Sequence, residues 1–210
     1  TWWEGKNFNR TNYGIYVEKE NFRGRKELIR FKLQLGFTEQ FALQYKIPYI
    51  NRKQTLGVSA TAGYWGNHEV NYGTLLNKRQ FLKDSEKYLR EEFYSRITFT
   101  YRKELYTTQL FELQYIDGKI ADTVAIIAPD YFINGNTQMT YFYALWQFRH
   151  DKRDYQPYPL EGYYYGIDLI KYGLGILPSE PNSLTAYFSV SKHHKISQRC
   201  ATRDIRDGRK

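Results

Sequence analysis

The chain has almost no cysteine, since Cys200 is the only one among its 210 residues. One thiol can form neither an internal disulfide nor a cysteine metal cluster. Long apolar runs are missing too: the aliphatic run Val124 to Ala128 falls far short of the roughly 20 residues of a membrane-spanning helix. These absences exclude a disulfide-rich scaffold and a helical membrane protein.

Patterns of catalytic or cofactor chemistry are also lacking. The phosphate-loop pattern GxxxxGK[ST] does not occur, and no nucleophile, base and acid can be assembled from the motifs. Asp151, Arg153 and Asp154 are interpreted as an ion-pair cluster at a turn, because an arginine between carboxylates fixes local geometry through charge-assisted hydrogen bonds. His193 and His194 are adjacent, so in a strand they point to opposite faces and cannot share a metal. We expect no enzymatic activity, no cofactor and no metal.

Acidic residues are outnumbered, which leaves a formal net charge of +9. A nucleic-acid-binding domain concentrates such charge in a patch or stripe. Here the basic residues are spread along the predicted strands, at Arg30, Lys32, Arg96, Arg102, Arg149 and Arg153. A polar barrel interior, or contact with anionic lipid head groups, explains this dispersion, and nucleic acid is not an expected partner.

Aromatic residues, in contrast, are abundant. They make up 18% of the chain, with 21 Tyr and 13 Phe, although the mean hydropathy is only -0.70. A transmembrane β-barrel combines these properties, because only alternate strand residues face lipid and aromatic residues gather at both membrane interfaces. The clusters Trp2–Trp3, Tyr141–Tyr143 and Tyr163–Tyr165 are interpreted as such an aromatic girdle, with stacking platforms for bases or sugars as the alternative.

A period of two residues recurs along the chain. In residues 93–102 the side chains of Phe93, Ile97 and Phe99 share one face of a strand, and Arg96 and Arg102 lie on the other. Nine segments show this alternation: 12–22, 27–37, 40–50, 56–65, 93–103, 106–117, 140–150, 163–173 and 184–193. Their lengths match barrel strands of about 9–11 residues, and the short gaps favour an antiparallel meander.

The remaining segments have weaker patterns. Residues 77–92 have few turn formers and predict a short loop helix outside the barrel, whereas 119–136 is an irregular connection. Pro48 lacks a backbone donor and should lie at the end of its strand. The stretch 200–210 neither alternates nor resembles a strand, and is interpreted as an irregular tail that is foreign to the barrel.

Two motif blocks go beyond generic barrel patterning. The first begins with the turn NFRGR at residues 21–25 and ends one strand later in YKIPYI at residues 45–50; the second combines FRHDKRD at 148–154 with YPLEG at 158–162. Both resemble conserved segments of the BamA/TamA-like superfamily of outer-membrane barrels, in the form found in Bacteroidota. The residues that carry the resemblance are Asn21, Phe22, Gly24, Tyr45, Pro48, Tyr49, Asp151, Arg153, Asp154, Pro159 and Gly162.

The resemblance covers residues 1–199 and implies an all-β fold, the N-terminal part of a sixteen-stranded transmembrane barrel, with about nine of its strands present. The first barrel strand would lie before Thr1, and the periplasmic POTRA domains and the later R-G-(F/Y) motif of the family are absent from the sequence. It further implies a place in the bacterial outer membrane, contact with its lipid, unfolded outer-membrane proteins as clients and assembly lipoproteins as partners. The alternatives left open are a porin-like channel, an outer-membrane phospholipase and a soluble all-β carbohydrate-binding module.

Overall fold

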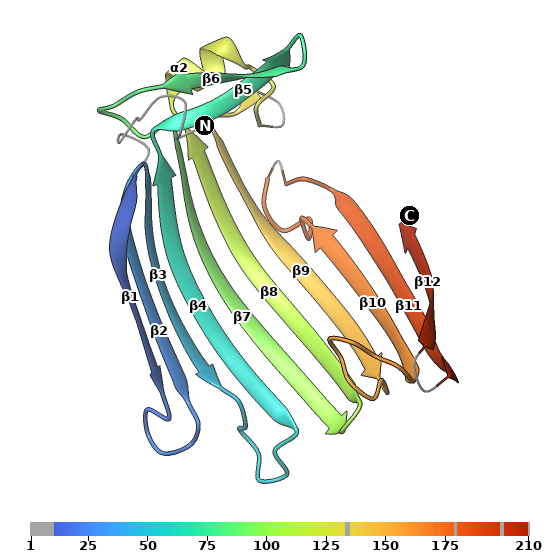
Figure 1. The fold of residues 1–210 in the computed structure, drawn as a ribbon. Coiled ribbons are helices and arrows are strands. Elements are labelled where there is room, and N and C mark those ends of the chain that lie inside the picture. Colours follow the sequence, from blue (N-terminus) through green and yellow to red (C-terminus); the bar gives the residue numbers. More distant parts are fainter. Residues whose placement is uncertain (1–10, 133–134, 179, 198–199, 210) are drawn as a thin grey trace.

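A single curved sheet of ten strands dominates the computed structural model, which describes residues 11–132, 135–178, 180–197 and 200–209 (Figure 1). Each strand runs antiparallel to its neighbours in the sheet. The strands of this sheet are β1 (Asn12–Glu20), β2 (Leu28–Gly36), β3 (Thr38–Ile47), β4 (Leu56–Asn67), β7 (Arg90–Glu104), β8 (Thr107–Ile120), β9 (Gln138–Asp151), β10 (Gly162–Tyr172), β11 (Ser183–Ser197) and β12 (Cys200–Arg209).

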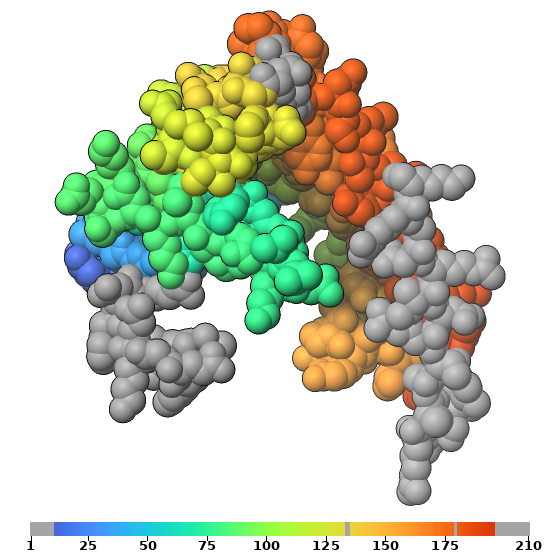
Figure 2. Space-filling model, turned by 90° about the horizontal axis from the view of Figure 1, so that it is seen from above, coloured from blue at the N-terminus to red at the C-terminus, as the bar shows by residue number. Residues whose placement is uncertain are grey.

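The strand order follows the chain, except that β7 pairs with β4 because the hairpin of β5 and β6 forms a separate sheet. The predicted antiparallel meander is therefore confirmed, and each of the nine predicted segments corresponds to one strand of the large sheet. Within the described residues, β1 and β12 are the outer strands and do not pair with each other, so the sheet is not closed. Seen from above, it curves around a hollow (Figure 2).

The prediction of an irregular tail was wrong in its conformation. Cys200–Arg209 is strand β12, paired with β11 from Tyr187 opposite Arg209 to Ser197 opposite Cys200. Ladder pairing uses the backbone N–H and C=O groups, which nearly every residue has, so a strand can form without alternating side chains. The missing alternation removed the sequence signal without preventing the strand.

The predicted helix over 77–92 was also wrong. The segment belongs to a hairpin of β5 (Glu69–Leu75) and β6 (Lys78–Lys83), followed by a turn in which Asp84 Oδ1 accepts the backbone N–H groups of Glu86 and Lys87. The two-residue loop consists of Leu76 (φ 47°) and Asn77 (φ 60°), which gives the left-handed pair typical of a type I′ hairpin. Leucine is a poor predictor of such a turn, so the helical pattern was favoured instead.

The backbone of this turn is strained at Leu76, and the strain can be tested. Leucine at a positive φ is unfavourable, whereas Asn-Gly is the preferred type I′ pair. The double substitution Leu76→Asn with Asn77→Gly should therefore stabilise the hairpin by about 1 kcal/mol. Hydrogen exchange of the β5 and β6 amides measures the effect, and Leu75→Asn, outside the turn, is the control. Equal protection in all three proteins would contradict the strained turn.

The main buried cluster lies at one end of the sheet rather than on either face. It contains Val70, Leu89, Ile120, Val124 and Phe132, which join the β5–β6 hairpin to helix α2 (Asp122–Ile127). Helix α2 lies within the predicted irregular connection 119–136. It has six residues, which is only about one and a half helical turns. No helix in the described ranges is both long and apolar enough to cross a membrane.

Candidate functional site

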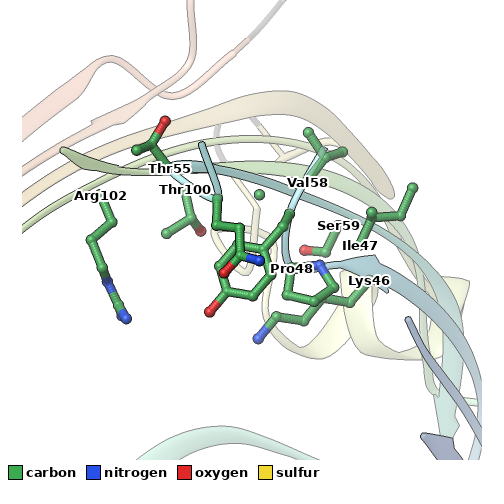
Figure 3. Close-up of a pocket in the computed structure, with 11 residues that line it drawn as sticks. Lys46, Ile47, Pro48, Thr55, Val58, Ser59, Thr100 and Arg102 are labelled. Atoms are coloured by element: carbon green, nitrogen blue, oxygen red, sulfur yellow. The ribbon is translucent and has the colours of Figure 1, made fainter. Parts of the chain in front are cut away.

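The two faces of the large sheet differ in chemistry. One row of directly paired residues crosses seven strands, β3, β4, β7, β8, β9, β10 and β11, and is apolar throughout: Ile47, Val58, Phe99, Phe111, Trp146, Leu169 and Ala186. Figure 3 places Val58 on the outside of the curved sheet and Lys46 and Arg102 on the inside. The apolar row therefore lies on the convex face.

This convex apolar face is open. Ile97, Phe99 and Phe111 are each nearly half exposed, and in the described part of the chain the only other sheet is the two-stranded β5–β6. A β-sandwich would bury such a face against a second layer. An exposed apolar surface that crosses so many strands marks contact with a membrane or with another protein.

Aromatic side chains border this convex face at both ends. Near the end that carries β5–β6, the ring centroid of Tyr115 lies 6.5 Å from that of Phe93 and 5.5 Å from that of Phe142. At the other end, His150 stacks on Tyr165 at 4.8 Å. Phe93 and Tyr101 are eight residues apart on β7, about 27 Å along the strand, or roughly 20 Å of height at a barrel tilt of about 40°. This height is close to the ~25 Å apolar band of membrane barrels.

Only part of the predicted aromatic girdle lies on the convex face. Phe142, Tyr163 and Tyr165 are convex, but the register places Tyr141, Tyr143 and Tyr164 on the concave face, opposite residues such as Gln114 of β8. Consecutive strand residues alternate, so three in a row cannot all face one side. Trp2 and Trp3 lie outside the described residues.

The concave face is polar, and several of its charges are paired between neighbouring strands. Arg30 donates to Glu18 Oε2 at 2.6 Å, and Arg149 donates to Asp168 Oδ2 at 2.7 Å. Arg96 donates to Gln114 Oε1 at 2.9 Å and lies 3.4 Å from Glu112. Charge-assisted bonds of this kind satisfy the cations without a hydrophobic core.

The first motif block forms a closed turn at the end opposite β5–β6. Asn21 (φ 54°) and Gly24 (φ 76°) provide the left-handed positions, and Asn21 Oδ1 accepts the backbone N–H of Lys26. Phe22 donates its backbone N–H to the Glu27 carbonyl, and its side chain stays 48% exposed. The motif glycine and asparagine are thus explained by backbone geometry.

Arg23 connects the two halves of this block. It donates to Glu27 Oε2 at 2.9 Å and to the Tyr45 hydroxyl at 2.6 Å. The hydrogen bond that Arg23 donates to Glu27 holds the pKa of this nearly inaccessible carboxyl below its ordinary value. Pro48 directly follows β3, as predicted, and with Tyr49 it lines a cavity that also touches Asn21. The sequence motif singled out the residues around Arg23 but not Arg23 itself.

The second block forms the β9–β10 connection. Arg153 makes a bidentate pair with Asp151, with Nε at 2.7 Å and Nη2 at 2.6 Å from the carboxylate oxygens. Its guanidinium also lies 4.8 Å from the ring centre of Tyr164. The Asp151–Arg153 ion pair is as predicted, but Asp154 does not join it, because Asp154 Oδ1 accepts the backbone N–H groups of Leu160 and Glu161.

The end of this connection depends on glycine. Gly162 has φ 104°, and a Cβ there would lie 2.2 Å from the Lys152 carbonyl oxygen. Pro159 is half-buried in the same loop. The described contacts of both motif blocks are hydrogen bonds, ion pairs, a cation–ring contact and close backbone packing, all of which hold the loops and adjoining strands in place.

Protonation of Asp154 should open this loop. Desolvation raises the pKa of Asp154, but the backbone N–H donors of Glu161, Tyr155 and Leu160 outweigh it and leave the pKa below its ordinary value. The folded loop therefore favours the carboxylate, so its stabilisation is complete above the unfolded-state pKa near 4 and is lost as the pH falls through the lower folded-state pKa. Amide exchange at Leu160 and Glu161, corrected for intrinsic rates, should rise over that range. Asp154→Asn should lack this step, and a step of equal size in the variant would contradict the assignment.

The other predicted candidates do not come together. The paired positions place His193 on the concave face, and the adjacent His194 is on the opposite one. Within the ranges that the structure describes, no group of three His, Cys, Asp or Glu side chains could hold a metal ion. The geometry available is that of a wall with one apolar and one polar surface.

Taken together, the curvature, the meander order and the two faces define part of an antiparallel β-barrel wall. A search of solved structures agrees: the chain is similar to the crystal structure of BamA from Haemophilus ducreyi lacking POTRA domains 1–3, with a TM-score of 0.59 at 13% identity. The match covers 89% of this chain and 37% of that chain. The fold is thus BamA-like, and the chain spans little more than a third of that structure's length. No family model matches the sequence, and no curated protein matches it.

Proposed function

We propose that the chain is part of an outer-membrane β-barrel in which the convex face contacts lipid and the concave face lines a water-filled lumen. The single observation that carries this proposal is the apolar row across seven strands, bordered by aromatic rings and left open to solvent. In water such a face would drive aggregation, whereas in a bilayer it is matched by lipid tails.

The loop lengths support one orientation. The end with β5–β6 and α2 carries the connections 68–89 and 121–137, while the opposite end includes the two-residue turn 105–106 and the motif loops 21–27 and 152–161 (Figure 1). Barrels of this class have short periplasmic turns and longer extracellular loops. We therefore assign both motif loops to the periplasmic end.

We further infer that the barrel acts in the insertion or translocation of other outer-membrane proteins. The support is the BamA-like fold together with the two motif blocks of the BamA/TamA-like superfamily, which lie at the same end of the wall. Such a function needs a weakly closed seam and a locally thinned bilayer rather than bond-breaking chemistry. Its partners would be outer-membrane lipid, unfolded outer-membrane proteins and assembly lipoproteins.

Depletion of the gene product in its host tests this proposal. The protein should fractionate with the outer membrane, and its depletion should lower the amounts of other folded, heat-modifiable barrel proteins. A loss of solute uptake with unchanged levels of those proteins would instead support a porin-like channel. Recovery of the protein from the soluble fraction would contradict the membrane location itself.

A further inference from the structure

Two cations of the concave face, Lys46 and Arg102, differ from the paired cations Arg30, Lys32 and Arg96. Arg30, Lys32 and Arg96 each reach an acceptor on a neighbouring strand: Arg30 on Glu18, Lys32 on Gln40 and Arg96 on Gln114. Lys46 and Arg102 make no side-chain hydrogen bond or ion pair with any residue that the structure describes. Both nevertheless line one cavity, so a pair of positive charges is left to interact with something else.

The cavity lies at the proposed periplasmic end, between β3, β4 and β7. Its volume is about 190 Å³, and its polar lining includes Lys46, Ser59, Thr100 and Arg102. In Figure 3 the side chains of Lys46 and Arg102 both extend to the concave side of the sheet. None of its lining residues is an aspartate or a glutamate, so its charge is purely positive.

No carboxylate lines this cavity, although Glu20 and Lys46 line a neighbouring cavity together and Glu104 is two residues from Arg102 on β7. Lys46 belongs to a row of directly paired residues on the concave face. In one direction the row passes through Leu28 and reaches Glu20. In the other it passes through Ser59 and Thr98 and reaches Glu112. At about 4.8 Å per strand, the backbone of Lys46 is roughly 10 Å from that of Glu20 and roughly 14 Å from that of Glu112. Glu112 already accepts a hydrogen bond from Thr98 and pairs with Arg96. Within the described residues, neither Lys46 nor Arg102 forms an ion pair with any of these carboxylates.

Local backbone features place Arg102 in the cavity. The register of β7 against β8 shifts between Tyr101 and Glu104, and this bulge includes Arg102. Bulges redirect side chains and occur at functional sites. The backbone N–H of Arg102 donates to the Thr55 carbonyl at 2.7 Å, which fixes it to the β3–β4 loop. Arg52 and Lys53 in that loop add further positive charge.

We propose that this cavity binds a phosphate-class oxyanion, with Lys46 and Arg102 as the charged ligands and Ser59 and Thr100 as hydroxyl donors. A guanidinium fork matches two phosphate oxygens, and an ammonium contributes a point charge to a third. Two hydroxyls add donors from other directions, which suits a tetrahedral anion with several acceptor oxygens better than a planar carboxylate. At about 30 Å³ per water, the volume leaves room for the anion and its hydration. The proposal does not depend on the function of the barrel in protein insertion.

Binding of inorganic phosphate to the folded full chain in detergent micelles tests the site. The ³¹P relaxation of phosphate at constant ionic strength gives the dissociation constant. The variant Lys46→Gln with Arg102→Gln should raise it at least 10-fold. The control, Lys32→Gln with Arg96→Gln, removes the same charge from paired positions and should change it less than 2-fold. Ser59→Ala with Thr100→Val keeps the charge and should weaken binding several-fold, which a mere field effect would not do.

Competition then distinguishes the source of the phosphate. Glycerol 3-phosphate and a short-chain phosphatidic acid should both displace the ion, and a lower displacing concentration for the lipid would assign the site to a lipid head group. Far-UV circular dichroism of each variant verifies folding, and the single variants replace any double variant that does not fold. Equal weakening in the two charge-matched double variants, or no phosphate binding by the folded wild-type chain, would overturn the proposal.

Discussion

Replacing Ile97 by lysine should destabilise the membrane-folded protein by about 2–4 kcal/mol, the range for a lysine at the bilayer midplane of a β-barrel. Ile97 is convex, 48% exposed, and lies midway along β7 between the aromatic residues Phe93 and Tyr101. If this face contacts lipid, the ammonium group has no water and no partner within reach. Denaturant titration of the protein folded into lipid vesicles measures the difference.

The neighbouring residue offers a matched control. Thr98 points to the concave face and donates to Glu112 Oε2 at 3.1 Å. Thr98→Lys places the same charge one residue along the same strand, but in the polar lumen and near a carboxylate. It should change the stability by less than about 1 kcal/mol. Equal losses of stability in Ile97→Lys and Thr98→Lys would contradict the assignment of one face to lipid and the other to water.

The second large effect is expected at Gly162. Alanine there would combine an unfavourable φ of 104° with a Cβ only 2.2 Å from the Lys152 carbonyl oxygen. Since the obstructing atom belongs to the backbone, the loop itself must shift and the Asp151–Arg153 pair with it. We expect Gly162→Ala to destabilise the protein by about 3 kcal/mol in the same titration.

Two other glycines calibrate this result. Gly24 has φ 76°, and a Cβ added there would have no atom within 4 Å, so Gly24→Ala should cost about 1–2 kcal/mol from conformation alone. Gly73 has neither a positive φ nor a near neighbour, and Gly73→Ala should be close to neutral. If Gly162→Ala were as mild as Gly73→Ala, the second motif would not hold the turn described above.

The period-two pattern predicted the sheet well because burial on one face leaves a strong mark on a strand. All nine alternating segments were strands in the predicted order, and Pro48 lay at the predicted strand end. The pattern failed where pairing depends on the backbone alone. The residues of β12 do not alternate, and the turn of the β5–β6 hairpin is Leu76–Asn77 rather than a preferred turn pair.

The candidate site was only partly readable from the sequence. The motif residues were recognisable, but their connection through Arg23 joins Glu27 and Tyr45, which are 18 residues apart, and no local pattern reveals it. Asp154 was grouped with Arg153 because they are adjacent, yet it binds backbone N–H groups across the loop. The unpaired state of Lys46 and Arg102 depends on which strands are neighbours, and so it required the structure.

A spin-label scan of residues 93–101 tests the central claim most directly. Single cysteines would be introduced after Cys200→Ser, and the labelled protein folded into vesicles. Accessibility to oxygen should peak at the odd-numbered positions, from Phe93 to Tyr101, because oxygen concentrates in lipid. Accessibility to a water-soluble nickel complex should peak at the even-numbered positions, from Tyr94 to Thr100. Access of the nickel complex to both faces alike would contradict a membrane-embedded wall.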